Sequence, residues 1–395
     1  MNSARPHVAL LVDQLGGGGA QRSATLTATA LHHLGHRATV LTARGGSYAS
    51  ELPADLNVQI LAPSWPSPRG VVIFLVRLRR AVLRHHVDVI LTNGFAVGRL
   101  ALLARLFGRL RGLSVIVVER NTLSVALADR FPNRLTRRAV RSLTRWLYRR
   151  ADAIIGVSDG VSRDLEATLR LQVGSVITIL NPVDAERITA AISEPVPEAL
   201  SHAFAALRRP IVITTGRLVT QKAHSDLLAA FALLPEPTRG SLVILGEGPL
   251  RGELEEQAQE LGITEDVWMP GFVENPWWFM ARADVFALSS RWEGHPRAIL
   301  EALACGIPIA STDCPSGPRE ILADEPRARL TPVGDAQALS YAISELLEDS
   351  EANSAKNLDR YKPASVAQAY ADVIVRAVEA SSMQSGIATR RGERP

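Results

Sequence analysis

Two glutamates with a spacing that suits ligand binding lie in the segment SSRWEGHPRAILEALACGIPIASTDCPSGPREIL, residues 289–322. Glu293 and Glu301 are eight positions apart, which is about two turns of an α-helix, so both carboxylates can reach the same cavity. Gly294 and the amides beside it open a predicted helix, where free N–H groups and the helix dipole attract an anion. Carboxylates that accept from hydroxyls, next to amides that donate to phosphate, suit a nucleotide-sugar.

The same segment resembles the Glu-x7-Glu signature of family 4 of the retaining glycosyltransferases, which have the GT-B fold. Pro296, the Ala-x-Ala-Cys-Gly run at 302–306 and Pro308 complete the resemblance. It implies that Glu301 binds the ribose of the donor, because one carboxylate can accept from two neighbouring hydroxyls. It also implies that Glu293 lies near the transferred sugar.

His295 stands where the family usually has an aromatic or aliphatic side chain. Two interpretations are open for it: a polar contact to the donor sugar, or a histidine in a solvent-facing loop. The resemblance implies that Gly294, His295 and Pro296 all lie against the donor. The loop at 313–320, Asp-Cys-Pro-Ser-Gly-Pro-Arg-Glu, is similar to one in relatives that handle polysaccharide or lipid-linked oligosaccharide precursors.

Positive charge for a diphosphate is expected in the segment Gly-Arg-Leu-x-x-Gln-Lys at 216–222. An arginine or lysine at a helix start is usually a solvated surface charge. Lys222, however, is the only lysine in the first 355 residues of a chain that otherwise uses arginine. The segment resembles one in family 4 whose basic side chains hold the donor diphosphate. This implies the same role for Arg217 and Lys222 and makes them catalytic candidates together with Glu293.

A run of four glycines, Gly16 to Gly19, follows the first predicted strand and precedes a helix. Glycines let the backbone approach a ligand closely, although a flexible turn is the simpler alternative. A dinucleotide site is disfavoured, because neither Gly nor Ala occupies the sixth position of a G-x-G-x-x-G frame here and the second strand lacks an acidic residue for the ribose. The loop resembles the Gly-Gly-Ala-x-Arg loop of family 4, which implies that Gly17, Gly18 and Gly19 lie near the donor phosphates and the acceptor.

Two further turns complete the predicted donor site. The segment Leu-Gly-Glu-Gly-Pro-Leu at 245–250 is similar to the Gly-x-Gly-Pro turn that shapes the nucleotide pocket in the family. Phe272 and Val273 lie in a segment that resembles the loop contacting the base in relatives. Trp277 and Trp278 are expected to pack in a core or between domains rather than to stack on a base.

In the first half of the chain, Glu119 and Arg120 end the fifth predicted strand. Many relatives place a histidine near this point, against the donor sugar, and this chain has none there. The role is left to Glu119 as a catalytic group, to Arg120 on the acceptor side, or to neither.

The elements that must position these residues are predicted from hydrophobic periodicity. Short apolar runs alternate with amphipathic stretches in both halves, which is typical of parallel sheets covered on both faces. The strands predicted in the first half are 7–12, 38–42, 58–61, 87–92, 114–118, 153–157 and 176–180. Those predicted in the second half are 211–215, 242–245, 267–269, 285–288 and 308–311.

The predicted fold class is α/β of the GT-B type, with two Rossmann-like domains facing a central cleft and ligands at the carboxyl ends of the strands. An N-terminal acceptor-binding domain is expected at 1–190 and a C-terminal nucleotide-sugar-binding domain at 191–363. A helix at 364–380 is expected to cross back to the N-terminal domain, as in other GT-B enzymes. Residues 381–395 are expected to form a flexible tail.

Composition fits a globular enzyme, because 395 residues suffice for two domains and 47% are hydrophobic and 21% charged. No apolar run is long enough for a transmembrane helix, and the first residues do not resemble a signal peptide. The two cysteines, Cys305 and Cys314, give no disulfide framework or metal spacing. A cytoplasmic protein is predicted.

Charge is divided unevenly along the chain. Residues 1–185 contain 24 arginines and 11 acidic residues, a net of +13, whereas residues 186–395 have a net of −9. A predicted amphipathic helix at 131–150 concentrates this charge on one face, with Arg134, Arg138, Arg141, Arg145 and Arg149. Its other face carries Leu135, Ala139, Leu143 and Leu147. The helix is either a solvated part of the fold or a contact to an anionic membrane surface; nucleic acid is disfavoured because no interleaved aromatics or known motif accompany the charge.

The resemblance implies a retaining enzyme that moves a hexose or N-acetylhexosamine from a nucleotide diphosphate-sugar, with UDP favoured, to a lipid-linked or polysaccharide-precursor acceptor. Neither a metal nor another cofactor is expected, and the enzyme is predicted to be peripheral at the inner face of the cell membrane. One alternative is a GT-B nucleotide-sugar 2-epimerase, whose acid–base histidines are not evident. The other is a catalytically silent GT-B scaffold, which the intact set of basic and acidic motif residues disfavours.

Overall fold

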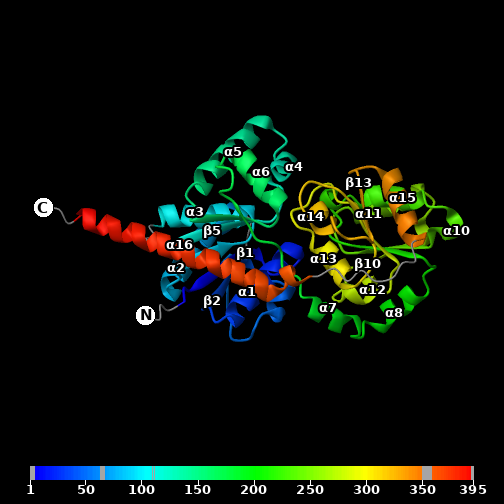
Figure 1. Ribbon diagram of the computed structural model, residues 1–395, viewed down its shortest axis with the longest axis horizontal. Coiled ribbons are helices and arrows are strands. Elements are labelled where there is room, and N and C mark those ends of the chain that lie inside the picture. The colour runs from blue at the N-terminus through cyan, green and yellow to red at the C-terminus, as the bar shows by residue number, and fades with distance from the viewer. Residues whose placement is uncertain (1–4, 63–66, 109, 111, 349–357, 393–395) are drawn as a thin grey trace. The chain divides into compact units, whose positions relative to one another are not determined.

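The computed structural model describes residues 5–62, 67–108, 110, 112–348 and 358–392. Its chain divides into an N-terminal unit, 1–182 with 360–395, and a C-terminal unit, 183–359 (Figure 1). The predicted boundaries, after 190 and 363, lie slightly further along the chain. The first boundary differs because helix α7 (Ala185–Ile192) packs on α12 (Pro276–Met280) and α13 (Arg297–Ala304) and so belongs to the C-terminal unit.

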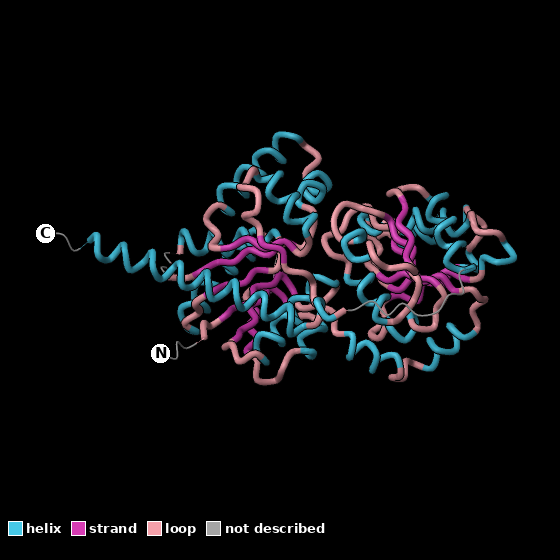
Figure 2. Tube along the Cα trace, in the orientation of Figure 1, coloured by secondary structure: helices cyan, strands magenta, loops and turns pink. Residues whose placement is uncertain are grey.

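The N-terminal unit is built on a sheet of seven parallel strands in the order β3-β2-β1-β4-β5-β6-β7. Figure 2 shows the strands in magenta, with helices in cyan around them. The strands are β1 (Val8–Gln14), β2 (Ala38–Arg44), β3 (Asn57–Ile60), β4 (Val89–Thr92), β5 (Ser114–Glu119), β6 (Ala153–Gly156) and β7 (Ile177–Thr178). Each overlaps a predicted strand. The interior strand β5 is buried along its whole length, because helices cover both faces of a parallel sheet.

Helices cover both faces of this sheet. The described helices of the unit are α1 (Gly19–His33), α2 (Pro68–His85), α3 (Phe95–Phe107), α4 (Leu123–Arg130), α5 (Arg134–Tyr148), α6 (Asp159–Leu169) and α16 (Pro363–Gly392). The crossover from β1 to β2 runs in the opposite direction along the sheet to those from β3 onward, so right-handed crossovers place their helices on opposite faces. Accordingly α1 packs with α16, whereas α2 and α5 each pack on α3 between them.

The C-terminal helix α16 is part of the N-terminal unit. Val366, Tyr370 and Ile374, spaced by one helical turn, are buried in the core of that unit. Residue 381 is expected from the sequence to begin a flexible tail, and in the structure the helix continues to Gly392; the flexibility of this segment stays a prediction. The segment 381–392 contains no proline to interrupt it, and extending a formed helix costs little.

The C-terminal unit has six parallel strands in the order β10-β9-β8-β11-β12-β13. They are β8 (Ile211–Thr215), β9 (Ser241–Leu245), β10 (Val267–Gly271), β11 (Val285–Leu288), β12 (Ile309–Thr312) and β13 (Ala328–Thr331). The first five match predicted strands. The sequence prediction missed β13, because this half-buried edge strand, Ala-Arg-Leu-Thr, lacks the continuous apolar run of a central parallel strand.

The described helices of the C-terminal unit complete a second doubly wound layer. Besides α7, α12 and α13 they include α8 (Glu198–Ala205), α9 (His224–Ala232), α10 (Glu236–Arg239), α11 (Arg251–Glu260), α14 (Pro318–Leu322) and α15 (Ala336–Glu348). Residues 193–197 connect α7 to α8 inside this unit. Both units are parallel-sheet Rossmann-like domains, which confirms the predicted fold class.

Candidate active site

The predicted donor-site segments of the C-terminal unit all follow the carboxyl end of a strand. The segment 216–222 follows β8, 246–250 follows β9, 272–273 follows β10 and 289–296 follows β11. In a parallel sheet these ends share one edge, which is where open α/β sheets bind their ligands. The topology therefore brings the predicted donor residues of this unit to one edge.

Lys222 and Glu293 form an ion pair at this edge. Lys222 Nζ lies 2.5 Å from Glu293 Oε1, which also accepts a hydrogen bond from the Ser290 hydroxyl at 2.7 Å. Both charged side chains are largely buried, with 18% and 7% of their areas exposed. Bonds between opposite charges are short and strong, so two catalytic candidates from separate motifs are held together before any ligand binds.

Three hydrogen bonds hold the loop after β8 against the loop after β11. The Arg291 amide donates to the Gln221 carbonyl at 2.9 Å, and Gln221 Nε2 donates to the Trp292 carbonyl at 2.9 Å. The Ser289 hydroxyl donates to the Lys222 carbonyl at 2.9 Å. These bonds fix the backbone of the lysine relative to the loop that carries its carboxylate partner.

The Gly-x-Gly-Pro turn after β9 packs closely on the loop that carries Arg217. A Cβ at Gly246 would lie 1.9 Å from the Gly216 carbonyl oxygen, and one at Gly248 would lie 2.3 Å from the Leu218 carbonyl oxygen. Only glycine fits such backbone contacts. The turn therefore fixes the backbone of the loop that carries Arg217, whose side chain is exposed. Its role in shaping a nucleotide pocket stays a prediction.

His224, the first residue of α9, is buried beside this loop and was not identified from the sequence. Burial, aided by the charge of Lys222, lowers the pKa of His224 to about 4, so the imidazole is neutral at physiological pH. Ala223 before it has a left-handed φ of 46°, which is costly for a residue with a Cβ. Backbone strain and a desolvated histidine next to a lysine are features that gather at functional sites.

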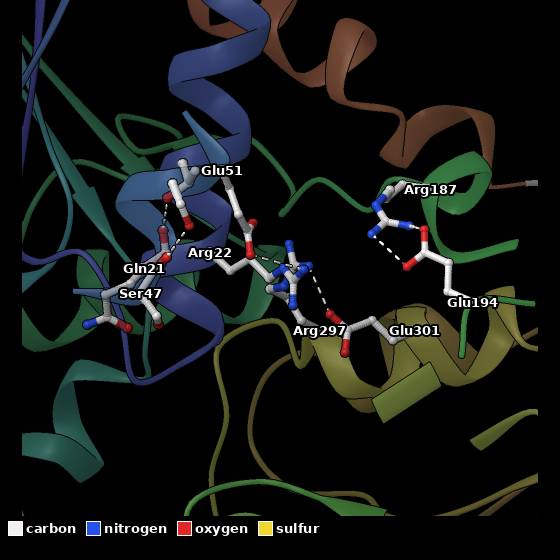
Figure 3. Close-up of polar contacts among 10 residues, drawn as sticks. Gln21, Arg22, Ser47, Glu51, Arg187, Glu194, Arg297 and Glu301 are labelled. Atoms are coloured by element: carbon white, nitrogen blue, oxygen red, sulfur yellow. Dashed lines mark hydrogen bonds and ion pairs between the residues drawn. The ribbon is translucent and has the colours of Figure 1, made fainter. Parts of the chain in front are cut away.

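Glu301, the predicted ribose ligand, is paired within α13. Arg297 Nη2 donates to Glu301 Oε1 at 2.8 Å, and both side chains are nearly buried (Figure 3). Arg297 was not identified from the sequence, although the i,i+4 spacing that joins the two side chains is that of a helical ion pair. A carboxylate has two oxygens with about four lone-pair sites, so this pairing leaves room for a hydroxyl. The ribose role stays a prediction.

The turn at Gly294, His295 and Pro296 packs on the loop after β12. Gly317 has a φ of +98°, and a Cβ there would lie 2.5 Å from Pro296 Cδ and 2.9 Å from the Gly294 carbonyl oxygen. His295 is buried, with 4% of its area exposed. The interpretation of His295 as a solvent-facing loop histidine is therefore wrong. A polar contact between His295 and the donor sugar stays a prediction.

The predicted base loop has one exposed and one buried side chain. Phe272 is 59% exposed, whereas Val273 is buried. Trp277 is buried, and Trp278 lies edge-on to Phe279 with ring centroids 5.0 Å apart. The two tryptophans therefore pack within their own unit, as expected.

The glycine loop of the N-terminal unit leads directly into α1. Gly17 has a φ of 84°, Gly18 is the N-cap and Gly19 is the first helical residue, and no acidic side chain lies in the first turn. Arg22, one turn further, pairs with Glu51 at 3.4 Å (Figure 3). Free amides at the start of a helix of this length are suited to phosphate, and the donor role of the three glycines stays a prediction.

Glu119 lies inside the N-terminal unit, at the end of β5. Its Oε1 accepts a hydrogen bond from the hydroxyl of Tyr148, on α5, and it is 3% exposed. Burial raises the pKa of Glu119 to about 7, and the bond from Tyr148 and the charge of Arg99 oppose that rise. Tyr148 belongs to no recognisable motif, so this pair could not be predicted from the sequence. The catalytic role of Glu119 stays a prediction.

Arg120 is buried rather than displayed at the surface, with 8% of its area exposed. Its Nε donates to Asn93 Oδ1 at 2.6 Å and its Nη1 donates to Asn181 Oδ1 at 2.5 Å. Asn93 follows β4, and Asn181 lies at the end of the first segment of this unit. The guanidinium thus ties two loops together, a role that the sequence did not indicate, and its contact to an acceptor stays a prediction.

The arginines Arg134, Arg138, Arg141 and Arg145 lie on α5, which begins at the N-cap Asn133. The first three are exposed and the last is partly exposed. The leucines of the other face are divided: Leu147 is buried, but Leu135 is 74% and Leu143 47% exposed. The arginine-bearing part of the helix therefore has apolar side chains in solvent among its charges, and the contact of α5 with a membrane stays a prediction.

Among the residues that the structure describes, no group of three or more His, Cys, Asp or Glu side chains is arranged to hold a metal ion. None of the described helices is both long and apolar enough to span a membrane.

Two family models together match most of the chain. Residues 17–187 match the model Glycosyltransferase Family 4, and residues 200–364 match the model Glycosyl transferases group 1. The first match begins in the glycine loop, and the second contains both the 216–222 segment and the Glu293 to Glu301 segment.

Individual relatives agree with these matches. An N-acetylgalactosamine-N,N'-diacetylbacillosaminyl-diphospho-undecaprenol 4-alpha-N-acetylgalactosaminyltransferase of Campylobacter jejuni is 29% identical over 349 residues, which are 87% of this chain and 90% of the relative. The solved structure of HepE from Anabaena in complex with UDP-glucose superposes with a TM-score of 0.70 at 21% identity, over 96% of this chain and 99% of that one. WaaG, a glycosyltransferase involved in lipopolysaccharide biosynthesis, superposes with a TM-score of 0.68 at 17% identity, over 95% and 99% of the two chains. The chain is a glycosyltransferase of the GT-B fold, with a Glycosyltransferase Family 4 domain followed by a Glycosyl transferases group 1 domain.

Proposed function

We propose that this enzyme transfers a hexose or N-acetylhexosamine, with retention of anomeric configuration, from a UDP-sugar to a lipid-linked or polysaccharide-precursor acceptor. The observation that carries the proposal is the 2.5 Å ion pair between Lys222 and Glu293. It joins the segment proposed for the diphosphate to the segment proposed for the sugar. An enzyme that must hold both parts of a nucleotide-sugar needs these two segments side by side.

The basic side chains of the 216–222 segment are proposed to hold the diphosphate. Arg217 offers a fork of N–H donors and Lys222 a compact charge, and phosphate oxygens accept from both. Lys222 is held largely out of water by its contact with Glu293, where electrostatic interactions are stronger than in bulk solvent. Backbone amides at the start of α13, after Pro296, add hydrogen-bond donors at the positive end of the helix dipole.

During transfer, the bond between the anomeric carbon and the diphosphate oxygen breaks and a bond from that carbon to the acceptor hydroxyl oxygen forms. The acceptor proton passes to the departing diphosphate on the same face of the sugar. The main requirement is stabilisation of the negative charge that grows on the diphosphate. Arg217 and Lys222 can supply this stabilisation, so we propose that the reaction needs no metal ion.

The donor and acceptor classes are supported by the relatives. The HepE structure holds UDP-glucose, the Campylobacter enzyme is named for a diphospho-undecaprenol substrate, and WaaG acts in lipopolysaccharide biosynthesis. The test is to incubate the purified protein with UDP-, GDP- and ADP-sugars and a lipid diphosphate-linked sugar. We expect release of UDP that depends on the acceptor, without added metal, and an α-linked product. A product of inverted configuration, or transfer from another nucleotide-sugar alone, would contradict the proposal.

Glu301→Gln and Glu293→Gln should affect different kinetic constants. A carboxylate that binds the ribose acts on the ground state and transition state alike, so Glu301→Gln should raise the donor KM about tenfold with kcat nearly unchanged. Glu293→Gln should lower kcat about tenfold, because Glu293 is proposed to act beside the reacting sugar. Steady-state kinetics with varied donor measure both effects.

Stability has to be followed in parallel, because Glu301→Gln also removes the ionic partner of Arg297. Glu256→Gln, an exposed change on α11, serves as the matched control. An unchanged donor KM in a folded Glu301→Gln variant would remove Glu301 from the ribose site.

We also propose that α5 brings the enzyme to an anionic membrane surface at the inner face of the cell membrane. Changing Arg134, Arg138, Arg141 and Arg145 together to Gln should weaken binding to anionic liposomes at least tenfold. Raising salt should weaken binding of the unchanged enzyme in the same way, because the Debye length falls to about 3 Å at 1 M. Co-sedimentation with liposomes measures both.

The four arginines are not proposed to touch the donor, so transfer to a short soluble acceptor analogue should persist in the variant. Co-sedimentation that is the same in the variant and the unchanged enzyme would show that α5 is a solvated helix of the fold.

A further inference from the structure

The outward face of α2 combines exposed apolar side chains with arginines. Successive residues of an α-helix are about 100° apart, and the arc of α2 that holds Phe74, Leu78 and Val82 is buried in the core. The opposite arc, about 160° wide on the same spacing, carries the exposed apolar residues Val72, Ile73, Val76 and Leu83, at 61%, 40%, 46% and 49% exposure. The same arc carries Arg69, Arg77, Arg79, Arg80 and Arg84. Val72, Ile73 and Val76 lie within about one turn of one another, and Leu83 lies about two turns further along the same arc. Apolar side chains gathered in solvent in this way call for a partner.

The apolar patch continues onto the end of α3. Arg79 Nε donates to the Gly108 carbonyl at 3.1 Å, so the carboxyl end of α3 lies beside α2. The residue before Gly108 is Phe107, which is 76% exposed. We name Val72, Ile73, Val76, Leu83 and Phe107 the α2 ridge.

A hollow lined by arginines lies on the other side of the ridge, towards β3. It has a volume of about 200 Å³ and is lined by Ile60, Arg77, Arg80 and Arg84 together with Gln59 and Ala81, without an acidic residue. Arg77 donates to the Leu61 carbonyl at 3.2 Å. Arg80 and Arg84 are exposed and lie one turn apart on one helix face. Two guanidinium groups so placed match the oxygens of one phosphate group.

The charge of this side of the unit, together with the apolar ridge, disfavours two kinds of partner. The sequences of α2, α3 and α5, which are neighbours on one face of the sheet, contain no Asp or Glu. A second copy of the same face would bring these arginines against one another, and like charges in contact are unfavourable. A nucleic acid would satisfy the arginines but would leave the apolar ridge in water. An anionic lipid bilayer satisfies both, with phosphates at the surface and acyl chains below it.

We propose that the α2 ridge is a membrane-docking surface, in which the apolar side chains enter the acyl region and Arg80 and Arg84 bind a lipid headgroup phosphate. The arrangement matches helices that lie in the membrane interface, with apolar residues inserted and arginine stems extending to the headgroups. The inference rests on the proposed function only in that the acceptor is membrane-borne. It differs from the contact proposed for α5, because insertion of apolar side chains is not screened by salt.

The apolar part is tested with the variant Val72→Ser/Ile73→Ser/Val76→Ser. Flotation with vesicles of phosphatidylcholine and phosphatidylglycerol, at 0.15 M and 1 M salt, measures the bound fraction. The unchanged enzyme should keep a salt-resistant bound fraction at 1 M salt. At that salt concentration the partition coefficient of the variant should be about tenfold lower. The matched control, Val173→Ser/Leu233→Ser/Leu261→Ser, removes three exposed apolar side chains elsewhere and should bind as the unchanged enzyme does.

The headgroup part is tested with Arg80→Gln/Arg84→Gln. This variant should bind anionic vesicles about tenfold more weakly at 0.15 M salt and should bind pure phosphatidylcholine vesicles as the unchanged enzyme does. The control Arg163→Gln/Arg376→Gln removes two exposed arginines of the same unit and should have a smaller effect.

Three results would overturn the proposal. The serine variant could float with vesicles as the unchanged enzyme does, or the Arg80→Gln/Arg84→Gln variant could bind anionic vesicles as its control does. Light scattering could also show dimers that the serine changes abolish without affecting flotation. Transfer to a soluble acceptor analogue is measured on every variant and should be unchanged. Its absence in the unchanged enzyme would count against the proposed function and not against the docking surface, which flotation reports independently.

Discussion

Lys222→Ala and Arg217→Ala are each expected to lower kcat by two or more orders of magnitude. A positive charge beside a departing diphosphate stabilises the transition state more than the ground state, because negative charge develops there. Removing one such donor from an active site typically lowers kcat by about 100-fold or more. Lys222 has 18% of its side-chain area exposed, so water can only partly replace it. Steady-state transfer from the preferred nucleotide-sugar measures the effect.

The structure adds a condition to the lysine experiment. Lys222→Ala removes the counter-charge that lies 2.5 Å from the Glu293 carboxylate, which is 7% exposed, and losing the counter-charge of a buried ion pair is destabilising. Lys222→Ala/Glu293→Gln removes that buried charge, so its stability shows whether the carboxylate unfolds the single variant. Its activity is compared with that of Glu293→Gln, which gives the loss due to the lysine. Lys222→Arg keeps the charge and should retain more activity than Lys222→Ala or the double variant. The control Arg208→Ala changes an exposed arginine of the same unit. Activity within threefold of the unchanged enzyme in a folded Arg217→Ala or Lys222→Ala variant would refute the diphosphate role.

The parts of the site that follow strand ends could be predicted from sequence. An uninterrupted apolar strand followed by a glycine turn places the next residues at the carboxyl edge of the sheet. Gly216 to Lys222 and Glu293 are of this kind, and their ion pair follows from that topology. Lys222 was also unusual as a residue type, because it is the only lysine in the first 355 residues of an arginine-rich chain.

Other contacts depended on tertiary structure that no local pattern encodes. Tyr148 meets Glu119 because α5 returns its last turn to the end of β5, and the two residues are far apart in sequence. The exposure of Leu135 and Leu143 could not be read from periodicity, because a helical wheel gives the relative direction of side chains but not how much of each face a neighbouring element covers. β13 was missed because edge strands lack the apolar continuity of central ones.

Glu119→Gln is expected to stabilise the N-terminal unit at high pH and not at low pH. Burial raises the pKa of Glu119 from 4.5 to about 7 in the folded protein, so the folded state binds a proton more tightly than the unfolded state does. The stability contributed by this group is present below pH 4.5 and is lost as the pH rises through 7. Gln cannot ionise, and its side-chain oxygen still accepts from the Tyr148 hydroxyl.

The difference in unfolding free energy between Glu119→Gln and the unchanged enzyme should therefore grow by about 2–3 kcal/mol between pH 5 and pH 8. Urea unfolding at the two pH values measures it, and terms independent of pH, such as the effect on Arg99, cancel in this comparison. Asp129→Asn, an exposed change on α4, is the control and should show little dependence on pH. A difference that stays constant from pH 5 to pH 8 would show that Glu119 is not held as the buried, protonated group of this structure. Activity then separates the two roles of Glu119: full transfer by the variant at pH 8 would make it a residue of the fold, and loss of transfer in a stabilised variant would make it a residue of catalysis.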